Sequence, residues 1–62
     1  MQFESEITAL EEEIEALHDL KGQFPDIQFK IEQLRQIKIK ELNKLKLKIK
    51  AMNSLINYVS NV

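Results

Sequence analysis

The fold is decided by residues 26–61, which read DIQFKIEQLRQIKIKELNKLKLKIKAMNSLINYVSN and contain neither Gly nor Pro. Apolar residues recur in this stretch at steps of three and four, which places them on one face of an α-helix. That face comprises Ile27, Ile31, Leu34, Leu42, Leu45, Ile49, Met52, Ile56 and Val59, with Lys38 in its gap. The stretch therefore predicts one long amphipathic helix over residues 26–61, with a change of phase at Lys38.

A competing pattern alternates apolar residues with Lys over residues 37–40 and 45–50, as a β-hairpin would. The turn would then fall on Asn43-Lys44, where Lys is unfavourable because such turns require positive φ. A hairpin of two strands is also marginally stable by itself. The helical period, which continues to Ile56, is the stronger interpretation.

A second, shorter apolar face precedes this stretch. Phe3, Ile7, Leu10, Ile14 and Leu17 follow a heptad spacing and predict a helix over residues 4–21. Residues 22–25 contain Gly22, suited to a helix C-terminus, and Pro25, suited to the first turn of the next helix. A connection this short makes the two helices antiparallel neighbours. The fold class is therefore all-α, a single helical hairpin over residues 1–62. Its expected core is Phe3, Ile7, Leu10, Ile14, Leu17, Phe24, Ile27, Ile31 and Leu34.

The two predicted helices differ in length by a factor of two, roughly 27 Å against 54 Å. The first helix then covers the second only from Asp26 to about Lys44. We therefore expect an oligomer interface made of Leu42, Leu45, Ile49, Met52, Ile56 and Val59. The predicted assembly is a homodimeric helical bundle or coiled coil through the second helix, antiparallel and centred near Asn43. A parallel coiled coil of the C-terminal halves is the alternative geometry.

The charges are divided between the two helices. Residues 1–21 hold seven acids and one base (net −6), and residues 22–62 hold eight bases and three acids (net +5). Opposite charges favour lateral pairing of these segments. Lys38 is expected to point inward, either reaching Glu6 or Glu13 or fixing the register of an oligomer.

No catalytic, metal or cofactor site is expected. The chain has no Cys, and its one His, His18, forms a Glu-x-x-His pair with Glu15 whose members lie at the edge of the apolar face or further toward solvent. No Ser or Thr has a base placed to activate it, and no Gly-rich phosphate loop is present. The absence of Cys and of a long apolar run predicts an intracellular, cytoplasmic protein that does not cross a membrane.

The expected function is a non-enzymatic protein–protein interaction module, acting as an adaptor or as a small stoichiometric inhibitor that docks a helical face in a groove. The alternative is an RNA- or DNA-binding hairpin dimer that contacts the polyanion through Lys40, Lys44, Lys46, Lys48 and Lys50. A third interpretation is a segment of a larger coiled-coil assembly.

The plan of a short acidic helix, a loop and a long helix resembles the RNA-binding dimer that controls plasmid copy number. The chain is also similar in size to the small aspartyl-phosphate phosphatases of sporulating bacteria. Their Ser-Gln-Glu-Leu-Asp motif corresponds here to Ile39-Lys40-Glu41-Leu42-Asn43, which lacks the Ser, Gln and Asp, so that activity is not expected.

Overall fold

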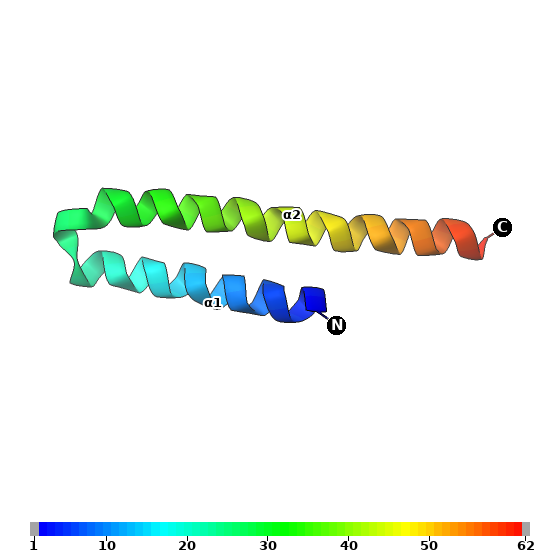
Figure 1. Ribbon diagram of the computed structural model, residues 1–62, viewed down its shortest axis with the longest axis horizontal. Helices are drawn as coiled ribbons and strands as arrows, with labels where there is room; N and C mark the ends of the chain where they lie inside the picture. The colour runs from blue at the N-terminus through cyan, green and yellow to red at the C-terminus, as the bar shows by residue number, and fades with distance from the viewer. Residues whose placement is uncertain (1, 62) are drawn as a thin grey trace.

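The computed structural model describes residues 2–61, with side chains from residue 4 onward, as two α-helices joined by one turn of 3-10 helix (Figure 1). Helix α1 is Gln2–Gln23, the 3-10 turn η1 is Pro25–Ile27, and helix α2 is Gln28–Ser60. The chain reverses direction at η1, so α1 lies antiparallel along the first part of α2 (Figure 1). The described residues form an all-α helical hairpin, as the heptad patterns predict.

The reversal begins two residues later than expected. Gly22 is helical, and no described residue has a positive φ, so the expected helix end at Gly22 was wrong. The amide of Phe24 still donates to the carbonyl of Leu20 at 2.9 Å, which continues the helical ladder past the glycine. Pro25 then opens η1, and it has no N–H to donate to the carbonyl of Lys21. The side-chain amide of Gln28 donates to that carbonyl instead, at 3.1 Å.

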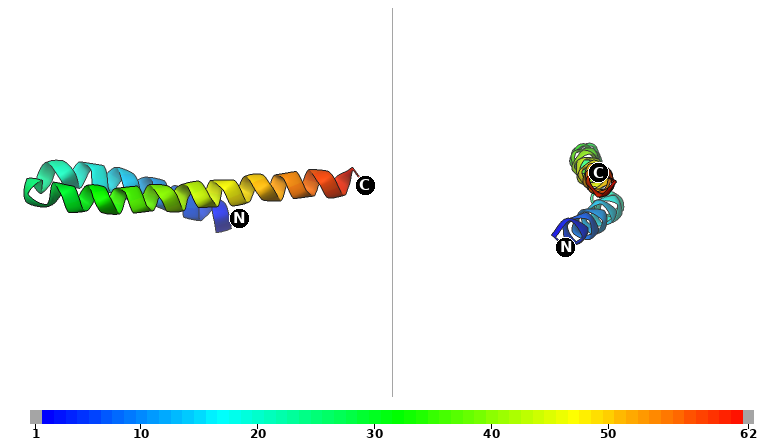
Figure 2. Two further views of the ribbon diagram at one scale, coloured as in Figure 1. Left: turned by 90° about the horizontal axis from the view of Figure 1, so that it is seen from above. Right: turned by 90° about the vertical axis from the view of Figure 1, so that its right-hand side faces the viewer.

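The hairpin is a rod. Its principal dimensions are 57 × 17 × 11 Å, and its radius of gyration is 16.0 Å, compared with about 11 Å for a compact domain of this length. Its accessible surface is 5229 Å², compared with roughly 4,200 Å² for a compact monomer of this mass. The end-on view in Figure 2 shows the two helices side by side as a single pair. Two helices alone therefore leave about 1,000 Å² more surface in water than a compact fold would.

The two helices meet along one heptad face of each. On α1, Ile7, Leu10, Ile14 and Leu17 are half-buried, as predicted. On α2, the seam, meaning the row of residues that faces α1, consists of Ile31, Arg35, Lys38, Leu42, Leu45 and Ile49. These residues follow steps of four and three without interruption, so α2 has one heptad phase and the expected change of phase at Lys38 was wrong. Only Ile31 (8% exposed) and Leu42 (9% exposed) are buried among the described residues.

Three predicted core positions on or near α2 lie outside this seam. Leu34 is 42% exposed because Arg35 occupies the seam position beside it. Phe24 and Ile27 are also exposed, because the 3-10 turn has three residues per turn and does not continue the helical phase from one helix to the next. The side chain of Phe3 lies outside the described residues.

No helix of the described residues is long and apolar enough to cross a membrane.

The position of the seam predicts the cost of shortening its side chains. Leu42→Ala should lower the free energy of unfolding by about 2–3 kcal/mol, because it leaves a void at a buried position. Leu47→Ala is the matched control, since Leu47 is exposed on the same helix and Ala and Leu are both good helix formers. It should cost less than about 0.5 kcal/mol. Urea unfolding followed by circular dichroism measures both, and equal losses would contradict the seam.

Candidate interaction surface

The C-terminal part of α2 extends beyond the end of α1 (Figure 1). Helix α2 has 33 residues and α1 has 22, a difference of eleven residues, or about 16 Å of helix. Every described residue from Lys50 onward is exposed. We call residues 50–61 the overhang. It continues the heptad seam with Met52, Ile56 (56% exposed) and Val59 (62% exposed), which have no covering helix.

The predicted oligomer interface is therefore divided in two. Leu42 is buried and Leu45 and Ile49 are half-buried within the described hairpin, so these three residues belong to its seam. The prediction that Leu45 and Ile49 lie beyond the first helix was wrong. Helix α1 has 22 residues, compared with 18 in the expected range 4–21, and therefore covers about one further turn of α2. The apolar residues Met52, Ile56 and Val59 are the part of the predicted interface that stays uncovered.

A second exposed row borders the seam. Leu34 and Leu55 lie three heptads apart on the same side of α2, and Ile37 lies next to Leu34 on the outer side; all three are exposed. The sequence places Ile37 and Leu55 together on one flank of the helix, but it does not predict Leu34 in this row, because Leu34 is expected in the core. A seam traced backward from Leu42 in steps of four and three passes through Lys38 and Arg35, and would have placed Leu34 on the surface.

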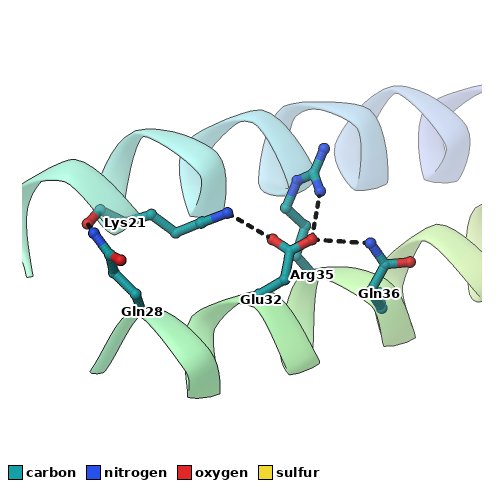
Figure 3. Close-up of polar contacts among 5 residues, drawn as sticks. All are labelled: Lys21, Gln28, Glu32, Arg35 and Gln36. Carbon is teal, nitrogen blue, oxygen red and sulfur yellow. Dashed lines mark hydrogen bonds and ion pairs between the residues drawn. The ribbon is translucent and has the colours of Figure 1, made fainter. Parts of the chain in front are cut away.

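A polar clasp ties the two helices together near the turn (Figure 3). The carboxylate of Glu32 accepts hydrogen bonds from Lys21 Nζ at 3.0 Å, from Arg35 Nη1 at 3.0 Å and from Gln36 Nε2 at 2.9 Å. Lys21 lies on α1 and the other three residues lie on α2, so this carboxylate joins both helices. The charge pattern of the sequence predicts that the acidic and basic segments lie side by side. It does not predict the pair of Lys21 and Glu32, in which the acid belongs to the basic helix and the base to the acidic helix.

The hydrogen bonds of Gln36 and Lys21, together with the charges of Lys21 and Arg35, lower the pKa of Glu32 from 4.5 to about 2 against the opposing effect of desolvation. They act by stabilising the charged carboxylate. Glu32 therefore stays ionised to a lower pH in the folded chain than it does in the unfolded chain.

A second charged contact lies within the seam. Lys38 Nζ is 3.5 Å from Glu13 Oε1 across the two helices, which confirms the expectation that Lys38 reaches one of the acids of the first helix. Arg35 is the other charged residue of the seam, and its Nε is buried with no hydrogen-bond partner among the described residues. Two cations thus replace apolar residues at adjacent seam positions, and each pairs with an acid.

The five lysines predicted to contact a polyanion are all exposed: Lys40, Lys44, Lys46, Lys48 and Lys50. None of them forms an ion pair with another residue that the structure describes. They belong to different sides of α2, because their spacing of two and four residues carries them around the helix.

His18 and Glu15 are both exposed. They border a shallow groove between the helices that is lined by Glu11, Ile14, Glu15, His18, Arg35, Ile39 and Leu42. Within the described part of the chain, no group of three or more His, Cys, Asp or Glu side chains is placed to hold a metal ion.

Comparison of the chain with protein-family models, with curated proteins and with solved structures found no match.

The pKa of Glu32 predicts how stability depends on pH. Above about pH 4.5 Glu32 is charged in both the folded and the unfolded chain, and its contribution to stability is fully present. Between about pH 4.5 and pH 2 the unfolded chain binds the proton first, so this contribution is lost as the pH falls. The free energy of unfolding of the native chain should therefore decrease more over this window than that of Glu32→Gln.

Urea unfolding at a series of pH values between about 6 and 2.5 measures both chains. The remaining carboxylates titrate in both proteins, so the difference between the two curves isolates Glu32. Parallel curves would show that the clasp does not act on stability.

Proposed function

We propose that the chain is a non-enzymatic protein–protein interaction module that associates with itself through α2. The observation that supports this proposal is the overhang, where Met52, Ile56 and Val59 continue the apolar seam without a covering helix. Burial of each such side chain contributes roughly 1.5–3 kcal/mol. Covering all three would contribute on the order of 5 kcal/mol, which is comparable to the whole stability of a small domain.

The surface of the hairpin supports the same proposal. The accessible surface of 5229 Å² exceeds that of a compact chain of this mass by about 1,000 Å². A standard stable interface buries about 800 Å² on each partner. One dimer interface of ordinary size therefore accounts for the excess.

The proposed dimer is antiparallel and centred near Asn43, which forms a four-helix bundle from two hairpins. This arrangement places the acidic α1 of one copy beside Lys46, Lys48 and Lys50 of the other, since these lysines lead into the overhang. A parallel dimer would bring the basic segments of the two copies together and would leave both acidic helices at a distance. Charge complementarity therefore favours the antiparallel form.

In the cell, a bundle of this kind acts as an adaptor or as a stoichiometric inhibitor that presents a helical face to the groove of a partner protein. If the hairpin is instead one segment of a larger coiled-coil assembly, the overhang would be the surface that packs against the neighbouring helices. The absence of Cys is compatible with the reducing, cytoplasmic compartment proposed for it.

Sedimentation equilibrium at about 10 µM tests the proposal. The native chain should sediment at twice its mass of 7.3 kDa. Ile56→Asp should sediment as a single chain, because a charged group cannot be buried without a partner. Ile56 is a better site than Ile49, whose half-buried position in the hairpin seam would also affect folding.

Leu47→Asp is the control for this substitution, because Leu47 is exposed on the side of α2 opposite to the seam. It should leave the mass of the dimer unchanged. A helical native chain that sediments as a monomer at this concentration would overturn the proposal.

The second candidate function is binding of RNA or DNA, and the five exposed lysines favour it. If it is correct, the double variant Lys44→Gln/Lys46→Gln should bind a labelled RNA or DNA duplex more weakly than the native chain does. The loss of affinity should be similar for duplexes of unrelated base sequence, because lysines contact phosphates rather than bases. The logarithm of the affinity should also fall linearly with the logarithm of salt concentration, and less steeply for the double variant. Fluorescence anisotropy measures both effects, and no binding at low salt would exclude this candidate.

A further inference from the structure

One side of α2 carries four exposed residues at successive heptad steps: Leu34, Glu41, Lys48 and Leu55. Seven residues make two turns of helix, so these side chains form one row beside the seam. The row runs from the part of α2 that is paired with α1 into the overhang. Read along the chain it is apolar, acidic, basic, apolar.

This order is complementary to itself when it is reversed. The interface of a two-fold dimer uses the same patch on both copies, so residue i contacts residue j and residue j contacts residue i. When two copies of the row run antiparallel, with the axis between Lys44 and Leu45, Leu34 of each lies opposite Leu55 of the other. Glu41 then lies opposite Lys48. In a parallel alignment Glu41 faces Glu41 and Lys48 faces Lys48, which is repulsive.

We infer that this row is the contact between the two α2 helices and that it fixes the register of an antiparallel dimer of the chain, with Leu34 against Leu55 and Glu41 against Lys48 of the second copy. The inference rests on the self-association proposed above, and it assigns the residues that select the orientation and the alignment. It also accounts for the exposure of Leu34, which lies on the covered half of α2 yet outside the hairpin seam.

The same register places the overhang of one copy beside α1 of the other. Lys38 pairs with Glu13 within the hairpin at 3.5 Å. In the antiparallel alignment Lys38 lies level with Ala51 of the second copy, so Glu13 comes near Lys50 of that copy. The carboxylate of Glu13 remains about half exposed in the hairpin and is free to accept a second cation. The two Lys44 side chains flank the axis at the solvent-exposed edge of the contact, where their repulsion is screened.

Disulfide trapping tests the orientation, because the chain contains no Cys of its own. Leu34→Cys and Leu55→Cys are prepared separately, mixed, and oxidised in a glutathione buffer. A disulfide requires Cα atoms about 4.4–6.8 Å apart. The mixture should give a crosslink between the two different variants, and Leu55→Cys alone should give little.

Charge reversal tests the register independently. Glu41→Lys and Lys48→Glu should each raise the dissociation constant of the dimer by about tenfold, because a two-fold dimer contains the contact twice. The double variant Glu41→Lys/Lys48→Glu restores opposite charges and should return the constant to within about threefold of the native value. Lys40→Glu is the control; it changes the same charge on a different side of α2 and should have less effect.

The outcomes separate this inference from the proposed function. The register is overturned if Leu55→Cys forms a crosslink with itself. It is also overturned if the dissociation constant of the double charge-reversal variant is as high as those of the two single variants. Either result leaves the proposal of self-association unaffected. A native chain that stays monomeric in sedimentation overturns both.

Discussion

The structure depends on hydrophobic contact along a single heptad seam, and a pair of helices can bury only one side of each partner. Ile31 and Leu42 are the two buried side chains among the described residues, and neither is fully removed from water. Two helices do not enclose an interior, because every seam residue remains near an open edge. Stability of the hairpin is therefore limited by the number of helices around the seam, and a further helix would deepen the burial of residues already in place.

The two cations in the seam give the contact its specificity. An apolar seam alone would allow α1 to slide along α2 by a heptad, since Leu and Ile recur at each step. Glu32 accepts a hydrogen bond from Lys21 across the two helices, and Lys38 pairs with Glu13, so a shift of one heptad would separate Lys21 from Glu32 and Lys38 from Glu13. Ion pairs at this exposure contribute little to stability. They set the alignment of the helices, a role that polar seam residues also have in coiled coils.

Much of the fold could be predicted from the sequence, because the helical period of Ile7–Leu17 and of Leu42–Val59 is uninterrupted. The middle of α2 could not be assigned correctly by apolar pattern alone. Leu34 and Arg35 are adjacent, and hydrophobicity favours Leu34 for the seam, whereas the phase set by Leu42 places Arg35 there. The clasp on Glu32 depends on residues eleven positions apart that meet only after the chain reverses. The helix lengths predict that the C-terminal end of α2 is uncovered. The uncovered part is shorter than predicted, because α1 is longer than predicted.

The proline at the turn has a consequence for the shape of the molecule as a whole. Helix α1 continues through Gly22 to Gln23, and α2 resumes at Gln28, so only a few residues separate two helices that would otherwise join into one straight rod. Pro25 prevents this, because its ring would clash with the carbonyl of Lys21, at a cost of about 3 kcal/mol in a continuous helix. Gln28 caps that carbonyl and satisfies the group that the proline leaves without a donor. The break between the helices is thus built into the covalent chain, and the contacts of the seam hold α1 against α2 on either side of it.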